Sequence, residues 1–204
     1  SRQSYVTGNA ARMAAITLRQ AMSSTAAEHL DAAPEYLRFE EGLVRQNGQS
    51  VPVGQVVEWM NEQGLQPKAT YEYWAPETQP LGTGGDMHFA FSYATQAALV
   101  EVDLDTGEVH VLKVIAGTDV GRALNPRALQ GQIEGGIVMA LGNALTEQYI
   151  IEDGVPWSTM MARYKIPSIK HAPEIISHLV EHPTADGPFG AKGVGEIPSI
   201  NTMP

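Results

Sequence analysis

The sequence AALVEVDLDTGEVHVLKVIA, residues 97–116, is the clearest structural signal in the chain. Two runs rich in β-forming residues, Ala97–Leu104 and Glu108–Ala116, flank the tripeptide Asp105-Thr106-Gly107. Asp and Gly adopt the backbone conformations of tight turns readily, so the two runs can pair directly with each other. The stretch therefore predicts an antiparallel β-hairpin.

A helix is expected directly after this hairpin. Asn125 is a good N-cap residue and Pro126 suits the first helical position, so we expect a helix from about Arg127 to Leu145. Each glycine in a helix interior costs about 1 kcal/mol relative to alanine. Glycines inside the predicted helix therefore indicate either tight packing or close approach by a ligand, and both explanations stay open at this point. These glycines are Gly131, Gly135, Gly136 and Gly142.

The rest of the chain mixes helices and strands without a strict βαβ order, so the expected fold class is α+β, with helices and antiparallel strands. An irregular, glycine-rich connector at 65–87 is the candidate boundary between subdomains. The other expected elements are a helix at 8–30, a hairpin at 36–45, a helix at 53–62 followed by a Gly64 cap, and strands at 71–74, 158–167 and 175–181.

Composition excludes several classes of function. The chain has 13 Lys and Arg against 23 Asp and Glu, a net charge of −10 that disfavours binding to nucleic acid or anionic lipid. It has no Cys, so disulfides, thiolate metal sites and cysteine nucleophiles are excluded. No apolar run is long enough to cross a bilayer. We therefore expect a cytoplasmic protein with no nucleic-acid or membrane partner.

One short motif suggests a zinc peptidase. The segment His178-Leu179-Val180-Glu181-His182 matches the H-x-x-E-H pattern, in which two His on one helical face bind zinc. The segment lies between prolines and is rich in Ile and Val, which favours a strand instead. A strand would point Glu181 away from the face that the two His share.

A second motif, Gly190-Ala191-Lys192-Gly193-Val194-Gly195-Glu196, lacks the spacing of a nucleotide-binding phosphate loop. Its glycines would let the backbone press against a ligand and place the Glu196 carboxylate at the ligand's edge. If shielded from water, that carboxylate would have a raised pKa suited to a general base. The alternative is a surface turn with a solvated Glu196.

Taken in order, four segments closely resemble the molybdenum hydroxylases, the xanthine dehydrogenase and aldehyde oxidase family. The match is to the C-terminal half of the molybdenum-binding subunit. The segments are SRQSYVTGNA at 1–10, DVGRALNPRALQGQIEGGIVMALG at 119–142, RYKIP at 163–167 and GPFGAKGVGEIP at 187–198.

The resemblance implies roles for particular residues. Glu196 matches the family's catalytic glutamate, the general base, and Gln132 matches a glutamine that hydrogen-bonds the pterin. The other implied cofactor-binding residues are Ser1, Gln3, Ser4, Lys192, Gly193, Val194 and Gly195. The family holds its metal through the pterin's sulfurs, so no protein metal ligand is expected. Asp119 and Asn125 are expected to be structural, capping a turn and a helix.

The resemblance also implies a larger assembly. Residues 1–204 would form a fragment of the molybdopterin-binding domain that is inactive alone and needs the N-terminal half of the same subunit. The cofactor would be molybdenum–molybdopterin, in its cytosine dinucleotide form in some relatives, with 2Fe-2S and FAD on partner modules and a dimer of the whole assembly. The implied reaction hydroxylates a purine-like N-heterocycle or an aldehyde with water as the oxygen source. A carbon monoxide dehydrogenase-type large subunit and a non-catalytic binding or scaffold domain remain alternatives.

Overall fold

The computed structural model describes residues 3–203, which divide into two compact units. The first, here called the small unit, comprises residues 7–74; the second, the sheet unit, comprises residues 3–6 and 75–203. One junction, after residue 74, lies inside the irregular connector, whereas the other lies inside the first helix. Each unit has its own hydrophobic core.

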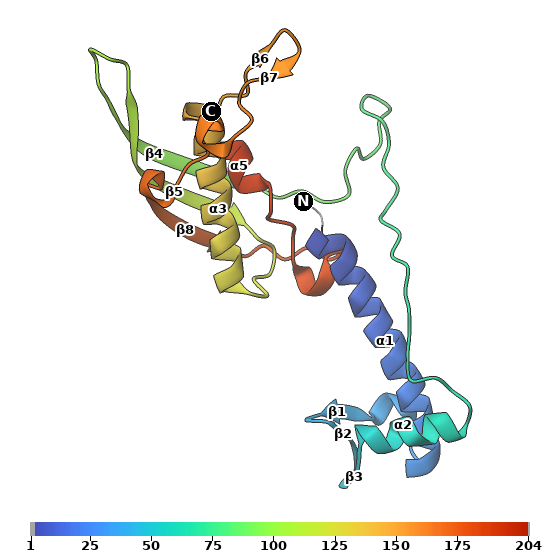
Figure 1. Cartoon of the computed structure of the whole chain (residues 1–204). Helices are drawn as coiled ribbons and strands as arrows, with labels where there is room; N and C mark the ends of the chain where they lie inside the picture. Colours follow the sequence, from blue (N-terminus) through green and yellow to red (C-terminus); the bar gives the residue numbers. More distant parts are fainter. Residues whose placement is uncertain (1–2, 204) are drawn as a thin grey trace. The chain divides into compact units, whose positions relative to one another are not determined.

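The small unit combines two helices with a three-stranded antiparallel sheet (Figure 1). Helix α1, Gln3–Leu30, begins five residues before the predicted start and supplies most of its length to this unit. The predicted hairpin and helix are confirmed, as is the Gly64 cap, where a φ of +74° lets the chain leave the helix. The remaining elements are β1 (Arg38–Glu40), β2 (Leu43–Gln46), β3 (Gln49–Pro52), α2 (Val53–Glu62) and a 3₁₀ turn at Pro34–Tyr36.

The sheet unit is built on the predicted hairpin, which is confirmed as β4, Ala94–Val102, and β5, Val109–Asp119. A third strand, β8, Glu174–Val180, pairs with β5 in parallel, so the sheet order is β4-β5-β8. Parallel pairing needs a long crossover, and the chain between β5 and β8 supplies one that includes a long helix. The α+β class is confirmed, with this one parallel pairing added to the antiparallel ones.

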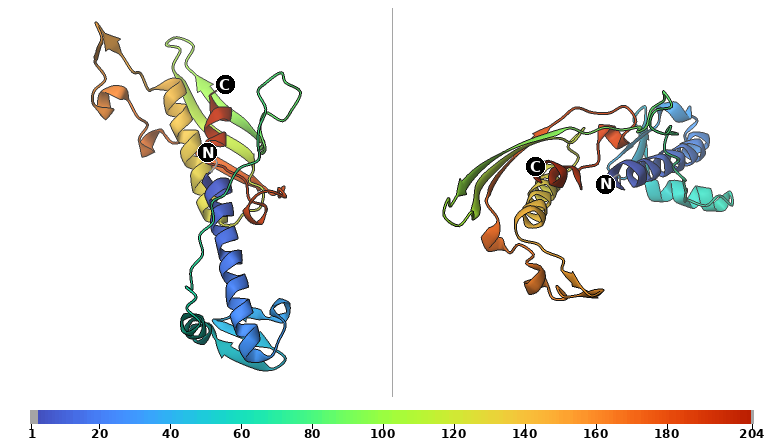
Figure 2. Two further views of the ribbon diagram at one scale, coloured as in Figure 1. Left: turned by 90° about the vertical axis from the view of Figure 1, so that its right-hand side faces the viewer. Right: turned by 90° about the horizontal axis from the view of Figure 1, so that it is seen from above.

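Two helices lie on the same face of this sheet (Figure 2). They are α3, Pro126–Leu145, and the short α5, Ile197–Thr202. The predicted N-cap is confirmed, since the Asn125 side chain accepts a hydrogen bond from the Ala128 N–H at 3.0 Å. The core between sheet and helices is formed by Val114, Ala116, Val120, Ile133, Ile137 and Val194.

Two predicted strands are wrong. Residues 71–74 are irregular, because β-forming residues make a strand only where a partner strand pairs with them. Residues 158–167 contain instead the short helix α4, Met161–Tyr164, which ends at Lys165 with a left-handed φ of +66°. A small hairpin that the sequence analysis missed, β6 (Ile151–Glu152) and β7 (Val155–Pro156), precedes it.

The four glycines of α3 have different surroundings. A Cβ at Gly142 would lie 2.4 Å from Cγ of Pro167, and one at Gly136 would lie 3.1 Å from Cβ of Pro198. Tight packing therefore accounts for these two positions. A Cβ at Gly131 or Gly135 would meet no atom within 4 Å, so packing within the described chain accounts for neither.

Within residues 3–203, no helix is both long enough and apolar enough to cross a bilayer.

Candidate functional site

An open cavity of about 920 Å³ in the sheet unit brings together segments that are far apart in the sequence. The start of α1 contributes Tyr5, and the segment before β4 contributes a group of aromatic and polar residues. The predicted site residues Lys192, Gly193 and Glu196 also line this cavity. The full lining is Tyr5, His88, Phe89, Ala90, Ser92, Tyr93, Ala94, Lys192, Gly193, Glu196, Ile197, Ile200 and Asn201.

Sequence reasoning missed the contribution of residues 88–93, HFAFSY, to this cavity. The Phe89 ring packs on the buried Tyr5 ring with centroids 5.3 Å apart, and His88 meets Phe91 edge-on at 5.9 Å. The available signal was the density of aromatic residues directly before a strand. It was overlooked because the segment matches no chemical motif.

Glu196 lies directly before α5, and its side chain is exposed. Its backbone carbonyl accepts hydrogen bonds from the N–H of Ser199 at 3.1 Å and from the Ser199 hydroxyl at 2.7 Å. The side chain makes no capping hydrogen bond to its own helix. The carboxylate is therefore presented to the cavity by a backbone that is itself held in place.

The pKa of Glu196 is lowered overall, although desolvation acts to raise it. This direction is opposite to the raised pKa expected for a shielded general base. Because the side chain is exposed, desolvation is too weak to determine the direction of the shift.

Lys192 and Asp119 form a buried ion pair. The ammonium Nζ of Lys192 lies 2.5 Å from Oδ2 of Asp119, and the two side chains are only 8% and 9% exposed. The other carboxylate oxygen of Asp119 accepts a hydrogen bond from the Gly121 N–H at 2.9 Å. The expected structural role of Asp119, capping a turn, is confirmed.

The backbones on either side of this ion pair also bond to each other. The N–H of Arg122 donates to the Gly190 carbonyl at 2.9 Å, and the N–H of Lys192 donates to the Val120 carbonyl at 3.1 Å. The two segments approach so closely that a Cβ at Gly121 would lie 2.3 Å from the Gly190 oxygen. The GAKGVGE segment is therefore tied directly to the turn that follows β5.

The other predicted cofactor-binding residues have varied positions. The Val194 side chain is buried in the sheet unit's core, which leaves its backbone for a cofactor contact, while Gly195 continues the segment to Glu196. Gln3 and Ser4 are exposed in the first turn of α1, and Ser1 lies outside the described residues. Gln132 is exposed on α3, one turn before Gly136, but it does not line the cavity.

The structure contradicts the zinc peptidase hypothesis. His178 lies in strand β8, as the prolines and branched residues predicted, so the required helix is not formed. Glu181 is engaged elsewhere, since its carboxylate accepts a hydrogen bond from the Ala123 N–H at 2.7 Å. Across residues 3–203, no group of three or more His, Asp or Glu side chains could hold a metal ion.

The cavity's donor set fits a cofactor that brings its own metal ligands. The lining includes residues with hydroxyl, amide and imidazole side chains, one glutamate, and Lys192, whose ammonium is paired with Asp119. Such groups bind a polar organic ligand by hydrogen bonds, whereas a protein-held metal needs a closed set of three or four ligating side chains. The residues present thus fit a molybdenum–pterin cofactor held through its organic part.

The chain belongs to the molybdenum hydroxylase family: the molybdopterin cofactor-binding domain matches it over residues 1–173. Subunit gamma of the 6-hydroxypseudooxynicotine dehydrogenase complex of Paenarthrobacter nicotinovorans is 31% identical over 212 residues, covering 97% of this chain and 25% of that protein. The family resemblance inferred from the sequence is therefore confirmed.

Solved structures agree on the fold. Quinoline 2-oxidoreductase from Pseudomonas putida 86 matches 99% of this chain and 26% of its own, with a TM-score of 0.81 and 28% identity. Reconstituted CO dehydrogenase from Oligotropha carboxidovorans matches 94% of this chain and 24% of its own, with a TM-score of 0.74; at 21% identity this likeness shows the fold alone. The chain spans about a quarter of the length of each of these three proteins.

Proposed function

We propose that this chain supplies the general base and part of the cofactor-binding surface of a molybdenum hydroxylase. The observation that carries the proposal is the position of Glu196, an exposed carboxylate on the wall of the sheet unit's cavity, in a chain of this family. The reaction is the hydroxylation of an N-heterocycle or an aldehyde with water as the oxygen source.

In this proposal the residues of the chain hold the cofactor and move one proton. When bound, the cofactor supplies the metal centre that accepts two electrons from the substrate. At one of its two oxygens, the Glu196 carboxylate would take up the proton that the water-derived hydroxyl loses as its oxygen bonds to the substrate carbon, because an ionised carboxylate is an acceptor only. The Gln132 amide and the first turn of α1, with Gln3 and Ser4, bind polar groups of the cofactor; the N–H groups of a helix start suit its phosphate.

The names of similar proteins support the N-heterocycle class of substrate. Quinoline is a nitrogen heterocycle, and the quinoline 2-oxidoreductase structure matches 99% of this chain with a TM-score of 0.81. We extend this class to the present chain. The likeness to CO dehydrogenase rests on fold alone and does not favour carbon monoxide as the substrate.

The complete enzyme would contain further parts. The similar 6-hydroxypseudooxynicotine dehydrogenase protein is named as subunit gamma of a complex, which supports an assembly in which iron–sulfur and FAD modules carry the electrons away. The remainder of the large subunit would complete the substrate pocket and the cofactor site. The cytosine dinucleotide form of the cofactor and a dimeric assembly belong to the same proposal.

The test replaces Glu196 by Gln in the full-length protein purified with its partner subunits. We expect E196Q to keep molybdenum and pterin near wild-type content while turnover falls by several orders of magnitude, because the general base acts in the chemical step rather than in binding. The matched control is E152Q, which changes an exposed Glu of strand β6, away from the cavity lining. Near-wild-type turnover of E196Q would contradict the proposal, and unaltered E152Q activity is required for its interpretation.

A further inference from the structure

Glu196 belongs to a segment that is anchored on both sides. On its C-terminal side, Pro198 packs against α3 at Gly136, and the Pro198 carbonyl accepts a hydrogen bond from the Gln96 amide at 2.8 Å. The Asn201 amide donates to the Ala94 carbonyl at 2.7 Å, which ties α5 to strand β4. Helix α5 therefore cannot move without breaking contacts to both α3 and the sheet.

On the N-terminal side, the anchor is the buried ion pair between Lys192 and Asp119. Lys192 precedes Glu196 by four residues, and Asp119 is the last residue of the central strand β5. Between them and Glu196, the Val194 side chain is inserted into the hydrophobic core. The segment from Lys192 to Glu196 is thus held at its beginning, its middle and its end.

A buried ion pair is an unusual means of holding a loop. Removing two charges from water is costly, and apolar residues of similar size often stabilise a protein equally well. Unlike an apolar contact, the ion pair fixes the orientation of the two side chains. One carboxylate oxygen of Asp119 accepts a hydrogen bond from the Gly121 N–H, and the other accepts one from the Lys192 ammonium. The position of the Lys192 side chain is thereby specified from the end of β5.

We propose that the Asp119–Lys192 ion pair is a positioning element that sets the location of the Glu196 carboxylate. This inference rests on the proposed function, in which Glu196 is the base. Lys192 acts through the short segment to Glu196, and Asp119 acts through Lys192. In this assignment the Lys192 ammonium serves the protein's own carboxylate rather than the cofactor.

The test uses the assembled enzyme with the variants K192M and D119N, singly and combined, and each of them also in the E196Q background. Molybdenum content, melting temperature, kcat and KM are measured for all variants. We expect K192M to keep its molybdenum content and KM while kcat falls on the order of 10²-fold, because small misplacements of a catalytic group have effects of that size. The double variant should melt at a higher temperature than either single variant, since it removes both buried charges and leaves neither unpaired. Its kcat should stay as low as that of K192M.

The matched control is K113M. Lys113 forms an ion pair with Glu174 at 2.9 Å between β5 and β8, and the two side chains are 35% and 59% exposed. Like K192M, K113M removes the cation of an ion pair that includes a residue of β5. Lys113, however, lies outside the segment that carries Glu196. The kcat of K113M should match that of the wild type.

A second measurement does not depend on turnover. Amide hydrogen exchange at residues 193–196 should be faster in K192M and in D119N than in the wild type, and unchanged in K113M. If K192M does not assemble, kinetics and hydrogen exchange are both measured on D119N. The Asn side chain has the same shape as Asp and keeps an oxygen that can accept the hydrogen bond from the Gly121 N–H.

The outcomes separate this inference from the proposed function. In the E196Q background, adding K192M should cause no further loss of turnover, because the pair acts only through Glu196. Wild-type kcat in K192M alongside an inactive E196Q would overturn the positioning role and leave the proposed base intact. An active E196Q would overturn the base, and unchanged exchange at 193–196 would by itself overturn the anchoring.

Discussion

Gly121 shows how strongly one residue is constrained by the approach of two segments. Its φ is +67°, and a Cβ would lie 2.3 Å from the Gly190 oxygen. We expect G121A to lower the free energy of unfolding by about 1 to 3 kcal/mol, because it combines a left-handed backbone with a steric clash. Thermal unfolding measures the loss. The matched control is G107A, whose φ of +75° is similar but whose Cβ would meet nothing within 4 Å, so its loss should be smaller.

Gln132 provides a second prediction at the scale of the residue. If its amide bonds the pterin, Q132A should weaken cofactor retention by about 1 to 3 kcal/mol, the typical effect of losing a buried hydrogen bond. Molybdenum and pterin content after extended dialysis measures retention. Gln130 lies on the same helix and its amide bonds Glu134 at 2.7 Å, so Q130A serves as the control. Equal occupancy in Q132A and Q130A would remove Gln132 from the site.

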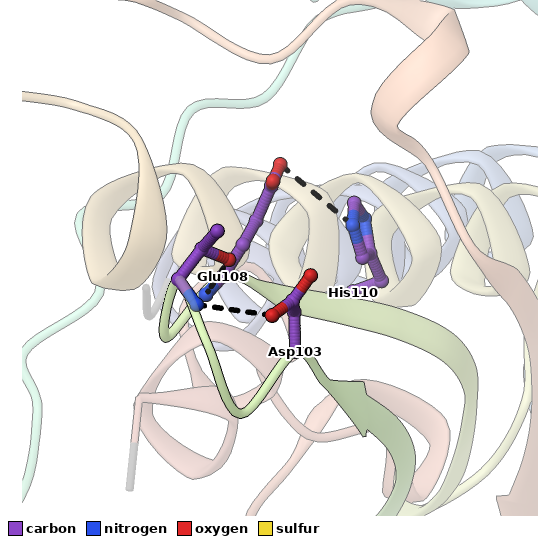
Figure 3. Close-up of polar contacts among 4 residues, drawn as sticks. Asp103, Glu108 and His110 are labelled. Atoms are coloured by element: carbon purple, nitrogen blue, oxygen red, sulfur yellow. Dashed lines mark hydrogen bonds and ion pairs between the residues drawn. The ribbon is translucent and has the colours of Figure 1, made fainter.

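The β4–β5 hairpin carries a prediction at the scale of the element. The Asp103 carboxylate accepts backbone hydrogen bonds from Thr106 and Asp105 in the turn, and these bonds lower the pKa of Asp103. Attraction to His110 acts in the same direction but is the weakest cause. On the other side of the turn from Asp103, the Glu108 carboxylate faces His110, with Oε1 of Glu108 3.7 Å from Nε2 of His110 (Figure 3).

Since the folded-state pKa of Asp103 lies below its unfolded value, its contribution to stability is present above the unfolded pKa. The contribution is lost as the pH falls through the folded value. We therefore expect D103N to melt at a lower temperature than the wild type at neutral pH, with the difference shrinking in acid. Melting curves recorded across this pH range test the prediction, and a difference that is independent of pH would contradict it.

Helix α3 offers a matched pair of glycine substitutions. G135A adds a Cβ in open space and should stabilise the helix by about 0.5 to 1 kcal/mol, whereas G142A meets Pro167 and should destabilise the protein by about 1 to 3 kcal/mol. Thermal unfolding of both variants tests these signs. If G135A instead lowers stability or molybdenum content, the full enzyme packs a ligand or another segment against this face. That result would support the second explanation for the glycines.

At the scale of the whole molecule, the prediction concerns metal content. The full-length gene product, purified with its neighbouring subunits, should contain about one molybdenum per large subunit if the complete cofactor is bound through its organic part, as the cavity's donor set suggests. Elemental analysis measures this value. Absence of molybdenum from a correctly assembled complex would favour a binding or scaffold domain without catalysis.

Local structure was largely determined by sequence. The β4–β5 hairpin, helix α2 with its Gly64 cap, and the Asn125 start of α3 follow from turn residues, caps and side-chain periodicity, which act over a few neighbouring residues. The four segments SRQS, GQIEGG, RYKIP and GAKGVGE were likewise sufficient to identify the family. Their order along the chain carries that information without any knowledge of the fold.

Long-range pairing was decided only by tertiary structure. The parallel partner of β5, the aromatic wall at residues 88–93 and the burial of Lys192 against Asp119 all join residues far apart in the sequence, and no local pattern encodes such distances. The wrong strand predictions at 71–74 and 158–167 have the same origin, because a β-forming segment becomes a strand only when another strand lies beside it. Sequence thus predicted Glu196 as the general base, whereas the contacts that hold its segment in place depend on how the chain packs.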